Sequence, residues 1–90
     1  MSVYKITIED TTNLTSLVFE IETISFEEAI RNILFYNFDE ETYDKVANAN
    51  VYGSTLKENV DKINKLIMPC KITHLVMNGR PINLESKNSE

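Results

Sequence analysis

The chain has 90 residues, of which 42% are hydrophobic and 26% charged, and its formal net charge is −5. These values are typical of one globular domain and exclude a disordered chain. No stretch approaches the roughly 18 consecutive apolar residues of a membrane span, so we expect a soluble protein without membrane contact. Cys70 is the only cysteine, and Met1 leads directly into a strand-like segment, which favours a reducing cytoplasmic location.

The negative charge is concentrated in the N-terminal half. Residues 1–45 contain ten acids and three bases, a balance of −7, whereas residues 46–90 contain four acids and six bases, a balance of +2. An acidic surface favours a basic partner and disfavours direct contact with nucleic acid.

Two half-buried strands are predicted near the N-terminus. Apolar residues alternate with polar ones in residues 3–9 and again in residues 17–22, and residues 10–13 between them are turn formers. This pattern predicts a β-hairpin with one face on the core.

The next segment predicts a helix that begins at Phe26. Ser25 and Glu28 form a capping box, and one helix face follows at spacings of three and four residues, with an apolar stripe of Phe26, Ala29, Ile30 and Ile33 that Asn37 extends. Phe35 and Phe38 fall on the polar side of this helix. We expect the segment that follows to cover both rings.

Two further helices are predicted. Asp39 caps a short helix that ends by residue 50, and Thr55 with Glu58 forms a second capping box before a helix that Pro69 terminates. On this last helix, Glu58 with Lys62 and Asp61 with Lys65 have the spacing of favourable ion pairs.

The C-terminal part predicts a second hairpin. Residues 72–77 read as a strand, Asn78-Gly79 is a strong turn signal, and residues 80–84 form a return strand. Pro81 lacks an amide donor, so this return strand should be an edge that pairs only briefly. We expect one compact domain over residues 1–84, followed by a disordered tail at 85–90.

The predicted fold class is α+β, with the element order ββααα-β(β). Two to three helices pack on one face of a small, mainly antiparallel sheet, which contains the N-terminal hairpin and a C-terminal strand or hairpin. Two arrangements stay open: the terminal strands pair in one sheet, or two separate hairpins enclose the helices.

The sequence lacks the residues of common catalytic and metal sites. Cys70 and His74 would share one strand face about 13 Å apart, at about 3.3 Å per residue, beyond hydrogen-bond reach. Asp39, Glu40, Glu41 and Asp44 lack the spacing and the glycine of a calcium loop. With only two glycines there is no phosphate-binding loop. We therefore expect no enzyme activity, no cofactor and no metal.

The leading hypothesis is an acidic interaction protein that binds, and inhibits or modulates, a basic partner protein that handles nucleic acid. In style, the chain resembles small acidic inhibitors of phages and mobile elements, including DNA mimics and anti-defence proteins. The predicted partner-binding residues are eight acids and two aromatic residues: Glu20, Glu22, Glu27, Glu28, Phe35, Phe38, Asp39, Glu40, Glu41 and Asp44.

Two alternatives remain. The first is a homo-oligomerising structural or assembly module, such as a homodimer that pairs through Phe35 and Phe38 or through the Pro81 edge. The second is an RNA-binding or antitoxin-like protein that uses the Lys-bearing helix with Lys57, Lys62 and Lys65.

Overall fold

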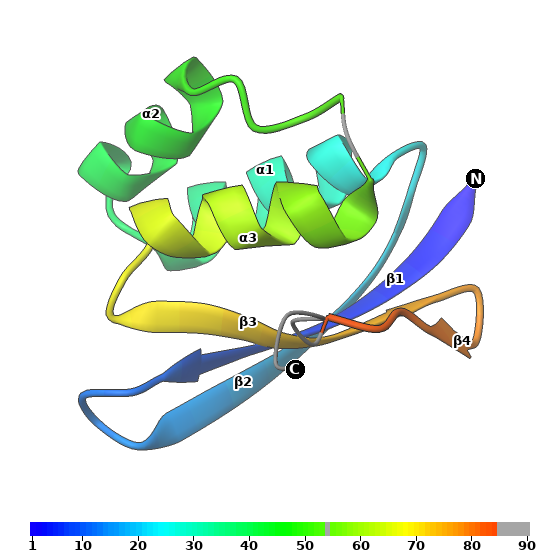
Figure 1. Cartoon of the computed structure of the whole chain (residues 1–90), viewed down its shortest axis with the longest axis horizontal. Coiled ribbons are helices and arrows are strands. Elements are labelled where there is room, and N and C mark those ends of the chain that lie inside the picture. Colours follow the sequence, from blue (N-terminus) through cyan, green and yellow to red (C-terminus); the bar gives the residue numbers. More distant parts are fainter. Residues whose placement is uncertain (54, 85–90) are drawn as a thin grey trace, which may run out of the picture.

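The computed structural model describes residues 1–53 and 55–84, so the predicted tail at 85–90 lies outside the described residues. Three helices lie on one face of a four-stranded antiparallel sheet (Figure 1). The predicted α+β class and the element order are confirmed.

The four strands form one sheet with the order β2-β1-β3-β4. Their bounds are β1 Ser2–Asp10, β2 Thr15–Thr23, β3 Cys70–Met77 and β4 Arg80–Pro81. The central strand, β1, pairs with β2 along its whole length and with β3 on its other side. The two ends of the chain therefore meet in a single sheet, and the arrangement with two separate hairpins is wrong.

The C-terminal hairpin turns where the sequence predicts. Asn78 and Gly79 have φ values of 52° and 82°, as a two-residue hairpin turn requires, and Met77 pairs with Arg80. The return strand is shorter than predicted: β4 ends at Pro81, although the Ile82 amide still donates a hydrogen bond to the Leu75 carbonyl at 2.8 Å.

The three helices begin at their predicted caps. Their bounds are α1 Phe26–Asn37, α2 Glu40–Asn48 and α3 Leu56–Leu66. The side-chain oxygens of Ser25, Asp39 and Thr55 each accept a hydrogen bond from the amide three residues later, at 3.1, 3.0 and 3.2 Å.

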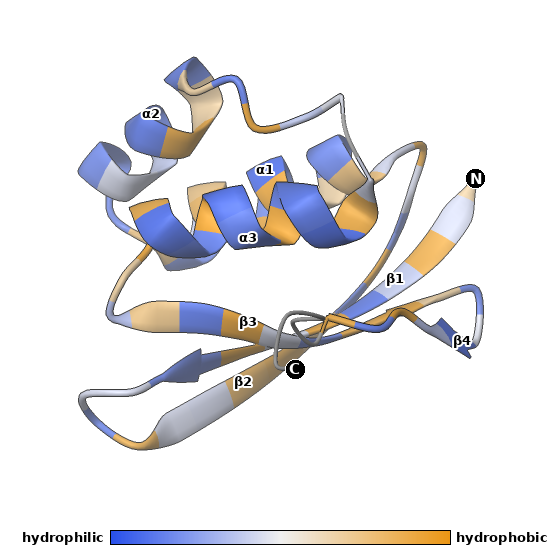
Figure 2. Cartoon of the chain, viewed as in Figure 1, coloured by the Kyte–Doolittle hydropathy of each residue, from blue (hydrophilic) through white to orange (hydrophobic). Residues whose placement is uncertain are grey.

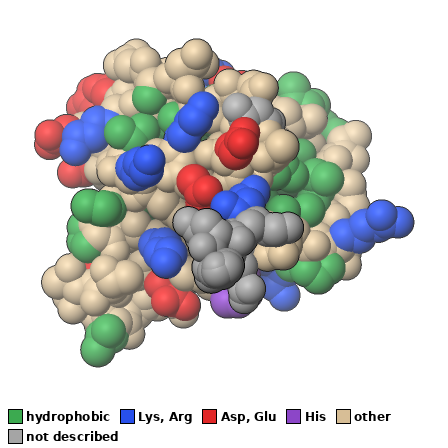
Figure 3. Space-filling view, in the orientation of Figure 1, with side chains coloured by type: hydrophobic (Ala, Val, Ile, Leu, Met, Phe, Trp, Pro, Cys, Tyr) green, Lys and Arg blue, Asp and Glu red, His purple; other side chains and the backbone are tan. Residues whose placement is uncertain are grey.

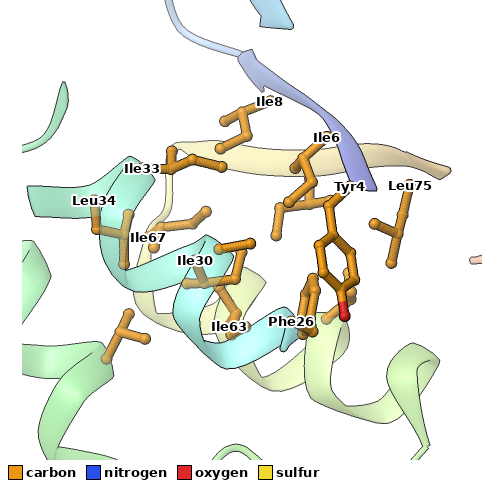
Figure 4. Packing of buried hydrophobic residues seen from close by; sticks show 14 of the residues in the cluster. Tyr4, Ile6, Ile8, Phe26, Ile30, Ile33, Leu34, Ile63, Ile67 and Leu75 are labelled. Atoms are coloured by element: carbon orange, nitrogen blue, oxygen red, sulfur yellow. The ribbon is translucent and has the colours of Figure 1, made fainter. Parts of the chain in front are cut away.

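The core lies between the sheet and α1 and α3. Tyr4, Ile6 and Ile8 of β1 point toward Ile30 of α1 and Ile63 of α3 (Figure 4). Ile6 and Ile63 are completely buried. Hydrophobic and hydrophilic residues alternate along the strands, and the helices leave one sheet face uncovered (Figure 2).

Candidate functional site

Glu20 and Glu22 lie on the uncovered face of the sheet. Phe19 pairs with the buried Ile6, so the odd-numbered side chains of β2 face the helices and the even-numbered ones face away. Lys5 lies directly opposite Glu20 on this outer face. These two acids are therefore on the opposite side of the sheet from all the other predicted acids.

Glu27 and Glu28 lie in the first turn of α1, where the helix dipole favours acids. Glu27 forms an ion pair with Arg31 at 2.8 Å, one turn later on the same helix. Glu27 also lines the pocket between α1 and α2, together with Tyr43 and Val46 of α2.

The remaining acids surround the start of α2. Asp39 is the cap, and hydrogen bonding from Thr42 holds the pKa of its carboxyl below the usual value. Glu40 and Glu41 occupy the first turn. Acidic side chains gather over α2 in the space-filling view (Figure 3). The predicted acids thus lie at three places in the fold, and the sheet separates Glu20 and Glu22 from those on α1 and α2.

An aromatic patch lies where α1 meets α2, formed by the exposed Phe35 and Tyr36 and by the partly buried Tyr43. Phe35 is 63% exposed and Tyr36 75% exposed. The Phe35 ring meets the Tyr36 ring at 4.9 Å and the Tyr43 ring at 5.8 Å between centroids, both edge to face. The expected cover over Phe35 is therefore wrong: Tyr43 of α2 touches one side of the ring and leaves most of it in solvent.

Phe38 behaves differently from Phe35. It follows the last residue of α1, is half-buried and packs against the core. The expectation that this ring is covered is confirmed in part. Tyr36 and Tyr43 take its place in the patch. Tyr36 could have been found from the sequence, because it does not fall on the apolar stripe of α1.

The acids nearest the aromatic patch are those of α2. Glu40 precedes Tyr43 by three residues, so both lie on one flank of this helix. Glu40 and Asp44 are four residues apart, a spacing at which like charges destabilise a helix. Lys45 lines the same surface hollow as Glu40, Glu41 and Asp44, so its positive charge offsets part of this repulsion.

A pocket of about 230 Å³ lies beside the contact between α1 and α2 and is also lined by the loop after α2. Leu34, Val46 and Tyr52 are among its lining residues. The Tyr52 hydroxyl is buried and has no hydrogen-bond partner among the described residues. Burial, with a smaller contribution from the Glu27 carboxylate, raises the pKa of Tyr52 to about 12.

This pKa predicts a loss of stability at alkaline pH. An unfolded tyrosine ionises near pH 10, whereas folded Tyr52 holds its proton until about pH 12. The unfolded state therefore binds fewer protons between these values, and the free energy of unfolding falls as pH rises through this window. Urea titrations of wild type and Tyr52→Phe from pH 8 to pH 12 test this, because the variant lacks the Tyr52 contribution. A difference between the two that stays constant with pH would contradict it.

Cys70 and His74 lie on opposite faces of the sheet. Cys70 pairs with Asp10 and packs against the core, whereas His74 pairs with Thr7 on the outer face. The prediction that they share a face is wrong, because the pairing shifts between Thr7 and Ile8 and leaves Thr73 as an extra residue in β3. Burial and the nearby Asp10 carboxylate raise the pKa of the Cys70 thiol, which lowers its reactivity.

The charged face of α3 differs in detail from the predicted pairs. Asp61 forms an ion pair with Lys57 at 3.0 Å, one turn before it, and not with Lys65. Within residues 1–53 and 55–84, the side chains form no cluster of three or more His, Cys, Asp or Glu that could hold a metal ion. In the same part of the chain, none of the helices has the length and apolar composition needed to cross a membrane.

Comparison with known proteins gives no relative for this chain. No protein-family model matches it, and neither the curated proteins nor the solved structures contain a match. The exposed aromatic patch with the acids of α2 is therefore identified as the candidate site from its own geometry and chemistry.

Proposed function

We propose that this chain is a non-enzymatic interaction protein that binds a basic segment of a partner protein through the aromatic patch and the neighbouring acids of α2. The observation that carries the proposal is the exposure of Phe35 and Tyr36, two large rings held edge to face at the end of α1.

The energetics favour a binding role for these rings. Burying a ring of this size stabilises a complex by about 1.5–3 kcal/mol, and exposed aromatic residues are frequent hot spots of protein interfaces. The contacts of Phe35 with Tyr36 and Tyr43 hold the three rings in place before binding. Little side-chain entropy is then lost when a partner docks.

The charge around the patch supports a basic partner. Arg and Lys side chains stack on aromatic rings, and the acids of α2 attract the same cations. The repulsion between Glu40 and Asp44 would be relieved by a bound cation. Proteins that handle nucleic acid carry such basic surfaces, so occupation of one by this chain would inhibit or modulate that partner.

The first test is an NMR titration of the protein with nona-arginine as a basic probe peptide. We expect shift changes at the aromatic patch and at α2. Replacing both Phe35 and Tyr36 with Ala should weaken binding about tenfold, because a loss of about 1.4 kcal/mol corresponds to that factor. Binding should also weaken as salt concentration rises.

Two charge variants provide matched controls. The first variant combines Glu40→Gln with Asp44→Asn, and the second combines Glu20→Gln with Glu22→Gln. Each variant removes two negative charges. Only the first pair lies beside the patch, so it should weaken binding several-fold while the second leaves it within about twofold. Equal losses in both variants, or unchanged binding after loss of the two rings, would show that nona-arginine responds to net charge alone and would overturn the proposal.

A further inference from the structure

The two edges of the sheet differ in how their backbone groups are protected. The β4 edge is only two residues long and contains Pro81. Beyond it, the backbone of Ile72 faces outward, and the Asn64 side chain of α3 accepts from its amide at 2.8 Å and donates to its carbonyl at 3.4 Å. A short strand, a proline and a covering side chain are features that prevent pairing with another chain.

The β2 edge has none of these features. It is nine residues long, pairs with β1 in an unbroken register from Thr15 to Thr23, and contains no Pro, Lys or Arg. Leu17 and Val18 on this strand are 59% and 55% exposed. A long, regular and partly apolar edge is a template for another strand.

The hydrogen bonds of β1 show which β2 groups face outward. The Val3 carbonyl accepts from the Asn78 amide, so the backbone groups of Val3 face β3. These directions alternate along an antiparallel ladder, so Ile6 faces β2 and exchanges hydrogen bonds with Phe19. The even-numbered residues of β2 therefore direct their N–H and C=O groups to the open edge: Ser16, Val18, Glu20 and Glu22.

We propose that a second copy of this chain pairs antiparallel along β2, with the two-fold axis at Phe19. Two four-stranded sheets would then join into one continuous sheet. In this register, Leu17 lies opposite Ile21 of the partner copy, and Phe19 lies opposite its own counterpart. On the outer face, Val18 lies opposite Glu20 of the partner copy, so no like charges are directly opposed.

The register with its axis at Phe19 fits β2 better than the two registers whose axis is shifted by one residue. An axis at Glu20 would place two glutamates directly opposite each other, which destabilises a strand pair. An axis at Val18 would place Ile21 opposite Thr15 and pair only seven residues. The axis at Phe19 pairs all nine residues of β2 and keeps apolar side chains together on the face toward the helices.

The net charge of −5 on each copy opposes the association. Lys5 lies beside Glu20 on the outer face and reduces this repulsion locally. Because salt screens repulsion between like charges, the dimer should strengthen as salt concentration rises. Binding of a basic partner at the aromatic patch should instead weaken as salt concentration rises. The salt dependence therefore allows each proposal to fail without the other.

The decisive experiment compares Val18→Glu and Val18→Lys by sedimentation equilibrium. Val18 is exposed, so both variants should fold, and circular dichroism is used to check this. Glutamate at this position opposes Glu20 of the partner copy twice in each dimer, and we expect the dissociation constant to rise about tenfold. Lysine faces the same glutamate, so the dimer should tighten. Wild type should dimerise, and its even-numbered β2 amides should exchange more slowly as protein concentration rises.

Three results would overturn this proposal. One is a monomer mass for wild type at every concentration up to about 1 mM. This result would mean that the free energy of dimerisation is weaker than about −4 kcal/mol. Another is a dimer that neither variant changes, which would place the contact elsewhere on the surface. The third is equal weakening by Val18→Glu and Val18→Lys, which would exclude the register centred on Phe19.

Discussion

Replacing Ile6 with Ala is expected to lower the free energy of unfolding by about 2–5 kcal/mol, the range for truncating a buried isoleucine. Ile6 is completely buried at the centre of β1, between the sheet and the helices (Figure 4). A domain of this length has a total stability of only about 5–13 kcal/mol, so the loss is a large part of the total. Urea denaturation measures it, and each kcal/mol should also lower Tm by about 4–8 °C.

The matched control is Ile24→Ala, which removes the same atoms from a side chain that is 69% exposed. We expect this variant to stay within about 0.5 kcal/mol of wild type, because it creates no cavity. Similar losses from the two substitutions would contradict the placement of Ile6 in the core.

Replacing Asn64 with Ala is expected to cost about 1–3 kcal/mol, because the N–H and C=O of Ile72 would lose their shared partner. Ile72 is buried, so water replaces these hydrogen bonds poorly. The same substitution at the exposed Asn48 provides the control and should change stability by less than about 0.5 kcal/mol.

Hydrogen exchange gives a local test of the same contact. The Asn64 side chain accepts a 2.8 Å hydrogen bond from the Ile72 amide and protects this amide from exchange. In Asn64→Ala, the exchange rate of the Ile72 amide should therefore rise by more than the loss of global stability alone would cause. An Ile72 amide that keeps its wild-type protection would show that Asn64 does not cover this edge.

Local chemistry explains why so much of the fold could be predicted. Each helix begins at a cap that bonds an amide three residues later, and the alternation of β1 is read within nine residues. The Asn78-Gly79 turn depends only on the positive φ that these two residues accept. None of these features needs information from distant parts of the chain.

The candidate site was only partly predictable for a related reason. Phe35 falls on the polar side of α1 by its spacing, but its exposure depends on where α2 docks, and α2 leaves most of the ring uncovered. The acids illustrate the same point. Their types and positions are in the sequence, whereas their division among the outer sheet face, the start of α1 and α2 follows from strand pairing and helix packing.

By itself, then, the sequence determined the element types, the helix caps, the C-terminal turn and the N-terminal location of the negative charge. Only the tertiary structure decided that β1 lies between β2 and β3, that one extra residue moves Cys70 and His74 to opposite faces, and that β2 is the open edge. The physical reason is the distance along the chain between the residues that decide each feature. Caps and turns are decided by neighbours in the chain, whereas β1 pairs with residues of β3 that lie 60 to 73 positions away, and side-chain alternation makes a one-residue shift reverse the face.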